Sequence, residues 1–145
     1  MKKEELIGAW KLITYQIFWK DTKKKIFPYG ENGAGYLIYT PDDFVSVQIM
    51  TFKRAKCRTN NFRDLSPDEK IEIADHSGGY IGKYEFKNDC VIHYPEIASF
   101  PNFINTPQVR QIEFKYPILI LKCPYSGKEF GNEGYSIIEW EKVHS

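Results

Sequence analysis

Hydrophobic residues are arranged in short, strand-like runs along most of this chain. The two clearest runs lie at 35–40 and 44–50, where aromatic and β-branched residues flank the turn Pro41-Asp42-Asp43. This pattern is typical of a β-hairpin. Within the second run, Ser46 and Gln48 are two positions apart and share one face, while the alternate positions are aliphatic. The hairpin therefore indicates a sheet with one packed face and one face that meets water or a ligand.

Similar runs predict strands in the remainder of the chain. The predicted strands are 9–19, 35–40, 44–51, 80–87, 90–97, 108–115, 118–123 and 135–143. Most connections contain turn-forming residues, and several have the short length of antiparallel hairpins. We therefore predict an all-β fold, an eight-stranded antiparallel up-and-down β-barrel, which leaves no sheet edge exposed. A barrel of this size is either filled by side chains or holds one small ligand.

One segment has the pattern of a helix. Ser66 is placed as an N-cap, Pro67 as the first helical residue, and Glu69 completes a capping box. Gly78-Gly79 is expected to end this helix. We predict one short helix between the third and fourth strands. The polar segment 55–64 before it lacks periodicity, and we expect it to form a mobile flap; the sequence does not decide whether it closes the barrel mouth.

Composition limits the classes of function. The length of 145 residues predicts a single domain over 1–145 that can bury a core without metal or disulfide bonds. With 20 basic and 19 acidic residues, the chain has no broad positive surface for nucleic acid. Cys57, Cys90 and Cys123 are widely separated, and no CxxC or Cys/His cluster occurs, so we expect reduced thiols, no metal site and no cofactor.

The apolar runs also bear on location. None at the N-terminus has the length of a signal-peptide core, and none elsewhere has the length of a transmembrane helix. We therefore expect a cytoplasmic protein without membrane insertion, present as a monomer or weak homodimer.

The start of the first strand, Gly8-Ala9-Trp10, resembles the Gly-x-Trp signature of lipocalins. Further stretches resemble the bacterial and fungal lipocalin-like domain family in the same order along nearly the whole chain. These stretches are LIGAWKL at 6–12, GYLIYT at 35–40, SVQ at 46–48, GKY at 82–84, VIH at 91–93, FPN at 100–102, QVR at 108–110 and WEKV at 140–143. The resemblance implies a small barrel with a ligand-sized cavity and Trp10 plugging its floor.

The chain also departs from secreted lipocalins, which have a disulfide and a signal peptide. Those proteins carry an arginine near the end of the last strand that packs over the first-strand tryptophan. Here the nearest basic residue is Lys142. Because one barrel hosts many functions, activity has to be argued from the site itself.

Strand alternation assigns side chains to the lumen or the outer surface. If Trp10 points inward, the same face of the first strand holds Leu12, Thr14, Gln16 and Phe18. On the third strand we predict that Ser46, Gln48 and Met50 point inward and that Val45, Val47 and Ile49 point outward. Other residues predicted to face the lumen are Tyr80, Gly82, Tyr84, Phe86, Val91, His93, Gln108, Arg110, Ile112, Phe114, Ile138 and Trp140.

This lumen is mostly aromatic with a few polar groups, which is typical of ligand pockets. The candidate ligand-binding residues are Ser46, Gln48, Met50, Tyr80, Tyr84, His93, Gln108, Arg110 and Trp140.

Arg110 is the most informative candidate, because an unpaired buried charge is costly. Either an internal carboxylate or tyrosine network satisfies it, or an anionic ligand does. The planar guanidinium fork is suited to a carboxylate.

His93 allows three interpretations: a hydrogen-bonded core histidine, a donor to the ligand, or a general base. It is the one candidate for a catalytic residue. Glu96 could orient it, but positions three apart on a strand face opposite ways. Only a bulge at Pro95 would bring both side chains inside.

Two main classes of function follow. We favour a binding protein that holds a small apolar or amphipathic molecule, with a carboxylate near Arg110. The alternative is a cavity-type enzyme, such as an isomerase, cyclase or hydrolase, in which His93 transfers protons and Tyr84 or Arg110 stabilises charge. A third possibility is a filled barrel whose outer surface binds a protein partner.

Overall fold

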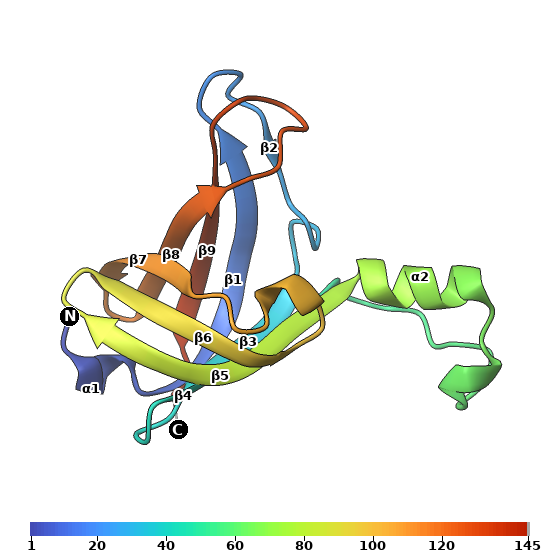
Figure 1. Cartoon of the computed structure of the whole chain (residues 1–145), viewed down its shortest axis with the longest axis horizontal. Coiled ribbons are helices and arrows are strands. Elements are labelled where there is room, and N and C mark those ends of the chain that lie inside the picture. Colours follow the sequence, from blue (N-terminus) through green and yellow to red (C-terminus); the bar gives the residue numbers. More distant parts are fainter. Residues whose placement is uncertain (145) are drawn as a thin grey trace.

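The computed structural model describes residues 1–144, and it shows a closed antiparallel barrel (Figure 1). The first long strand, β1 (Gly8–Trp19), pairs with β3 (Ala34–Tyr39) along one edge and with β9 (Gly134–Lys142) along the other, which closes the sheet. The strands between them follow chain order: β4 (Phe44–Met50), β5 (Ser77–Lys87), β6 (Cys90–Ala98), β7 (Gln108–Lys115) and β8 (Ile118–Tyr125). The predicted eight-stranded up-and-down barrel is confirmed.

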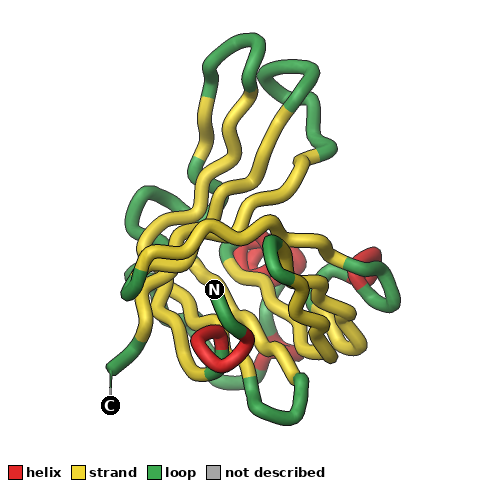
Figure 2. The backbone as a smooth tube through the Cα atoms, turned by 90° about the vertical axis from the view of Figure 1, so that its left-hand side faces the viewer, coloured by secondary structure: helices red, strands yellow, loops and turns green. Residues whose placement is uncertain are grey.

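A two-residue strand, β2 (Lys25–Ile26), pairs with the far end of β1 in addition to these eight. The far ends of β1, β8 and β9 extend beyond the rest of the barrel with their connecting loops (Figures 1 and 2). Because β2 adds a strand to the count, the helical segment follows the fourth strand and does not lie between the third and fourth.

The main helix, α2 (Pro67–Asp75), begins as predicted. Ser66 Oγ accepts a hydrogen bond from Glu69 N at 3.3 Å, and the Glu69 carboxylate accepts one from Ser66 N at 3.1 Å. The expected end at Gly78-Gly79 is wrong, because both glycines belong to β5. A Cβ atom at Gly79 would overlap with the Val47 carbonyl oxygen, so glycine here serves close strand pairing.

The shorter helical elements are α1 (Lys3–Leu6), η1 (Phe62–Asp64) and η2 (Pro101–Phe103). Within residues 1–144, no helix combines the length and apolar character needed to cross a bilayer.

One end of the barrel, which we call the closed end, is sealed around Trp10. Its side chain is fully buried and its indole N–H donates to Leu6 O at 2.8 Å. The Lys142 ammonium lies 4.4 Å from the centre of the indole ring and donates to Ile7 O, and to Glu5 O at 3.1 Å. The contact that the resemblance assigns to an arginine is therefore made here by a lysine.

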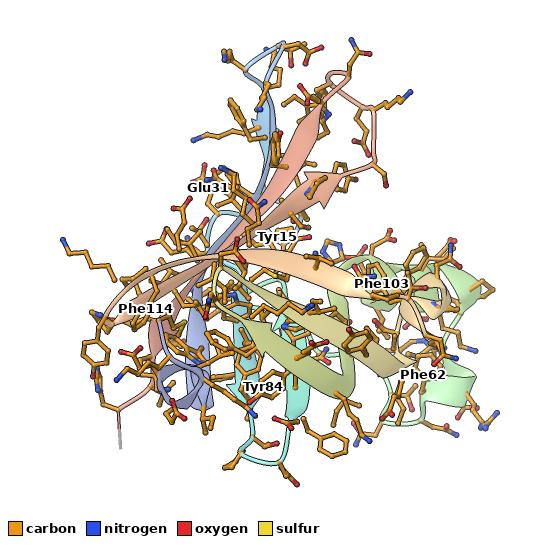
Figure 3. The ribbon with its side chains drawn as sticks, turned by 60° about the vertical axis from the view of Figure 1, so that its left-hand side comes forward. Tyr15, Glu31, Phe62, Tyr84, Phe103 and Phe114 are labelled. Carbon is orange, nitrogen blue, oxygen red and sulfur yellow. The ribbon has the colours of Figure 1, made fainter. Side chains whose placement is uncertain are left out.

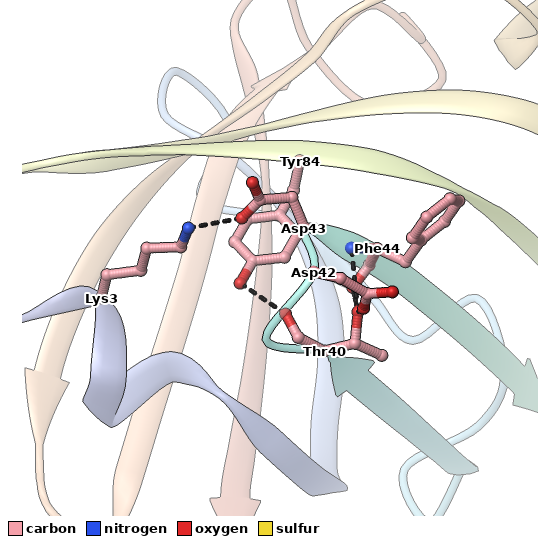
Figure 4. A network of polar contacts seen from close by, with 6 residues as sticks. All are labelled: Lys3, Thr40, Asp42, Asp43, Phe44 and Tyr84. Atoms are coloured by element: carbon pink, nitrogen blue, oxygen red, sulfur yellow. Dashed lines mark hydrogen bonds and ion pairs between the residues drawn. The ribbon is translucent and has the colours of Figure 1, made fainter.

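The closed end is packed with aromatic side chains and fastened by polar contacts. Phe114 packs edge-on against Trp10 and lies at the opposite end of the barrel from Phe103 (Figure 3). Tyr84 donates to Thr40 O at 3.0 Å in the β3–β4 turn, and Lys3 pairs with Asp43 in the same turn (Figure 4). The buried core around them is Leu6, Trp10, Leu12, Leu37, Tyr39, Val45, Ile49, Tyr84, Val91, Leu119, Leu121, Ile138 and Trp140.

A β-bulge in β1 changes which residues face the interior. The pairing with β9 shifts between Leu12 and Thr14, so Ile13 is the extra residue. Beyond it, Ile17 and Trp19 are buried. The prediction that Thr14, Gln16 and Phe18 share the face of Trp10 is therefore wrong, because a simple alternation does not continue through a bulge.

The facing of β4 also differs from the prediction. Trp10 pairs with Leu37, and Leu37 pairs with Val47, so these three side chains share the inner face. Consequently Val45, Val47 and Ile49 point inward. The predicted inward position of Ser46, Gln48 and Met50 is wrong, since they alternate with this set; Gln48 and Met50 are exposed. On β5, β6, β7 and β9 the burial of alternate residues agrees with the predicted faces.

Candidate functional site

The barrel contains a cavity of about 540 Å³ on the side where α2 and η2 lie. We call this the cavity end. Most of its wall is apolar, with aliphatic and aromatic side chains from the inner faces of four strands: Leu37, Val47, Ile49, Leu121, Ile138 and Trp140. The polar groups of the wall are few and are concentrated on Tyr15, Tyr29, Tyr80, His93 and Arg110. A mostly apolar cavity of this size with a few polar groups is typical of small-molecule sites.

Four of the nine predicted ligand-binding residues line this cavity together. They are Tyr80, His93, Arg110 and Trp140.

The other five predicted residues lie elsewhere. Ser46, Gln48 and Met50 are on the outer face of β4. Tyr84 is buried in the closed end, and Gln108 bonds through Nε2 to Thr106 O at 3.1 Å.

His93 is fully buried between two tyrosine hydroxyls. Tyr39 Oη lies 2.7 Å from Nε2, and Tyr80 Oη lies 2.6 Å from Nδ1. Burial lowers the pKa of His93 well below its usual value of 6.5, and the positive charge of Arg110 acts in the same direction. The imidazole is therefore neutral at physiological pH, and both of its nitrogens are engaged by protein groups. This geometry is that of a hydrogen-bonded core histidine.

Glu96 does not join His93. A bulge does occur beside Pro95, because Ile81 pairs with Ile97 while Gly82 pairs with Pro95. The bulged residue is Glu96 itself, and its side chain is exposed. The bulge thus turns the carboxylate outward, and no His–Glu dyad forms.

Arg110 projects from β7 into the same wall. It lies beside the Tyr80 hydroxyl, and its Nη1 donates to Cys123 Sγ at 2.6 Å; Cys123 Sγ is 2.9 Å from Ser136 Oγ. Burial lowers the pKa of Arg110, but Tyr80 and Cys123 outweigh this and the net shift is upward. The guanidinium is therefore cationic. No acidic side chain within residues 1–144 forms an ion pair with it.

Tyrosine hydroxyls surround this cation. Burial raises the pKa of Tyr15 to about 12 against the opposing effect of Arg110, and burial also raises the pKa of Tyr80 and Tyr29. All three hydroxyls are neutral at physiological pH and can donate hydrogen bonds.

Tyr15 and Tyr29 were missed in the sequence. Tyr15 comes to the cavity only because of the bulge in β1, and Tyr29 lies in the loop between β2 and β3, where no alternation applies. Their rings pack edge-on at 5.6 Å. The aromatic residue within the turn Tyr29-Gly30-Glu31-Asn32-Gly33 is the one signal that marks Tyr29 in the sequence.

Trp140 contributes an unpaired donor. Its side chain is 1% exposed and lines the cavity, and its indole N–H has no hydrogen-bond partner within the described chain. Buried polar groups normally have partners, so such an exception marks a place where a further group can bind.

The mouth of the cavity is formed by α2 and η2. Ile73 and Ala74 of α2 line it, together with Phe100 and Phe103, and Phe103 packs edge-on against Tyr80 at 6.1 Å. The segment 55–64, which we predicted as a mobile flap, contributes no residue to this wall. Residues 51–58 line a separate cavity of about 340 Å³ beside α2. Mobility of the segment stays a prediction.

No group of three or more His, Cys, Asp or Glu side chains within residues 1–144 is arranged to hold a metal ion. Comparison with known proteins identifies one family. A family model described as a lipocalin-like domain matches residues 7–143. A search of curated proteins returns no match.

Proposed function

Because this chain belongs to the lipocalin-like domain family, we propose that its barrel binds a small apolar or amphipathic molecule carrying a carboxylate. The cavity volume of about 540 Å³ lies within the range of ordinary ligand pockets, about 300–1,000 Å³. The aliphatic and aromatic wall would bury the apolar part of the molecule, which is the main source of binding free energy for such ligands.

The observation that carries the proposal is that the Arg110 cation lines the cavity without a carboxylate partner. A buried cation without a carboxylate partner is costly, and no acidic residue of the described chain pairs with this one. A ligand carboxylate would supply the missing partner and can accept two parallel hydrogen bonds from the guanidinium. The unpaired Trp140 N–H in the same wall offers a further donor.

The alternative of a cavity-type enzyme is not favoured by any observation. Its proposed acid or base, His93, has both nitrogens engaged by Tyr39 and Tyr80, and Glu96 is on the outer surface. A general base must reach the proton that it removes. Binding without chemistry is therefore the better supported function.

We also propose a cytoplasmic location and a monomer or weak homodimer. Cys57, Cys90 and Cys123 are all unpaired thiols, which suits a reducing compartment. The closed barrel also leaves few strand edges for association.

The proposal is tested with two probes that differ only in charge, the fluorescent fatty acid cis-parinaric acid and its methyl ester. We expect Arg110→Gln to weaken the acid about tenfold or more, since a hydrogen bond to a charged group contributes about 1.5–3 kcal/mol, and to leave the ester nearly unchanged. Lys83→Gln, on the exposed outer face of β5, is the matched control and should affect neither probe. Equal losses for acid and ester in Arg110→Gln would contradict a carboxylate anchor.

A further inference from the structure

The Tyr39 hydroxyl has a single hydrogen-bond acceptor within reach in the described chain. Tyr39 is 1% exposed, and His93 Nε2 is the one polar atom of the described residues within hydrogen-bond distance of its Oη. Leaving a buried O–H without an acceptor costs about 1–3 kcal/mol. Tyr39 therefore donates to His93 Nε2.

This donation fixes the protonation of the imidazole. A neutral histidine carries one proton, and a nitrogen that accepts a hydrogen bond is the unprotonated one. Since Nε2 accepts from Tyr39, the proton of His93 is on Nδ1. The Nδ1–H group then donates to Tyr80 Oη, which lies 2.6 Å away.

Consequently, no protein group in the described chain accepts the proton of the Tyr80 hydroxyl. Its oxygen accepts from His93 and lies beside the Arg110 guanidinium, which offers donors and no acceptor. Within the described chain no acceptor other than His93 lies in reach of this hydroxyl, while Tyr80 lines the cavity. With the opposite tautomer, Tyr80 would donate to His93 and the buried Tyr39 proton would have no partner.

We propose that Tyr39 and His93 act as positioning residues that hold the Tyr80 hydroxyl as a hydrogen-bond donor to the ligand carboxylate beside Arg110. This inference rests on the proposed function and adds a second contact to it. We call the three residues the Tyr39–His93–Tyr80 relay. Tyr80 and Arg110 together present donors, so the relay selects a ligand group that only accepts hydrogen bonds, such as a carboxylate, over an alcohol or amine.

The tautomer of His93 is measured directly by long-range ¹H–¹⁵N correlation spectra of the unliganded protein, with assignment by comparison with His93→Gln. We expect a protonated Nδ1 and an unprotonated Nε2. A protonated Nε2 overturns the relay. This readout needs no ligand, so it decides the inference even if no carboxylate probe binds and the proposed function fails.

The effect on binding is measured with Tyr39→Phe, which removes a hydroxyl that does not line the cavity. Without Tyr39 as a donor, His93 can accept from Tyr80 and withdraw that proton from the ligand. We expect cis-parinaric acid to bind about tenfold more weakly, the methyl ester to be unchanged, and the spectra to show a protonated Nε2. Unchanged affinity for the acid overturns the relay.

Tyr84→Phe is the matched control. Tyr84 is also buried, packs edge-on against Tyr39 at 4.9 Å, and bonds to Thr40 O and not to His93. We expect this variant to keep both the tautomer of His93 and the affinity for the acid. A loss equal to that of Tyr39→Phe would show that any buried hydroxyl acts through packing alone, which contradicts the relay.

Discussion

The two ends of the barrel each bury an indole ring, and the two rings differ in their polar partners. At the closed end, the Trp10 N–H donates to Leu6 O and the Lys142 ammonium covers the ring. At the cavity end, Trp140 is equally buried but its N–H has no partner in the described residues, and Arg110 has no carboxylate.

This difference distinguishes a tryptophan that stabilises the fold from one that lines a candidate binding site. Burial alone does not distinguish the two tryptophans, because both are at most 1% exposed. Satisfaction of hydrogen bonds does distinguish them. The polar groups around Trp10 have partners, whereas the cavity end contains the Trp140 N–H, which has no acceptor within the described chain. For this reason we use unsatisfied polar groups, and not burial, as the indicator of a candidate ligand site.

The largest effect is expected from emptying the closed end. Trp10→Ala removes a fully buried ring and leaves a cavity, so the free energy of unfolding should fall by about 3–5 kcal/mol. Urea unfolding followed by circular dichroism measures this. Ile38→Ala, at a position 42% exposed on the outer face of β3, is the control and should change stability by much less. A loss below about 1 kcal/mol for Trp10→Ala would show that this ring does not seal the barrel.

Replacing the cation by methionine should have different effects at the two ends. Lys142→Met loses the cation–π contact with Trp10 and two hydrogen bonds, so we expect a loss of about 1–2 kcal/mol. Arg110→Met removes a cation that has no carboxylate partner but is in contact with Tyr80 and Cys123, so we expect loss of anionic probe binding with a smaller loss of stability than in Lys142→Met. Urea unfolding of both variants gives the comparison. Destabilisation by both to the same degree would mean that Arg110 is already satisfied within the protein.

A smaller effect is expected from acid. Since the pKa of His93 is lowered on folding, the unfolded chain binds a proton below pH 6.5 that the native state does not bind, and stability falls as pH falls below this value. The full slope is about 1.4 kcal/mol per pH unit, so we expect a loss of about 1 kcal/mol by pH 5.5.

The control for the acid effect is His93→Gln, in which this part of the pH dependence should disappear. His144→Gln, near the exposed chain end, should keep it. Unfolding free energies between pH 5 and 8 measure both. A pH dependence that persists in His93→Gln would assign the loss to other groups.

The parts of the fold that were predicted correctly depend on local chemistry. Ser66 and Glu69 form the capping box that their spacing indicates, and the short turns specify antiparallel neighbours. Closure of the barrel followed from eight sequential strands. The inward positions of Tyr80, His93 and Arg110 followed from alternation within regular strands.

The features that the sequence did not predict depend on residues of adjacent strands and loops, which meet only after folding. Both faces of β4 carry hydrophobic residues, so alternation within that strand cannot choose between Val47 and Gln48; the pairing with Leu37 decides it. The polar contacts of His93 also require partners from β3 and β5 that meet only after folding. Tyr29 reaches the cavity from a loop, where strand periodicity gives no information.

The extra residue in β1 changes which positions of the strand point into the barrel. Before Ile13 the inward positions are even-numbered, as in Trp10 and Leu12, and after it they are odd-numbered, as in Tyr15 and Ile17. A change in the number of residues at this point, and not in their kind, would exchange the tyrosine beside Arg110 for its neighbours. The presence of one extra residue in β1 therefore decides which side chains of this strand line the cavity. Two relatives with the same residue types can differ in their ligands through one inserted or deleted residue.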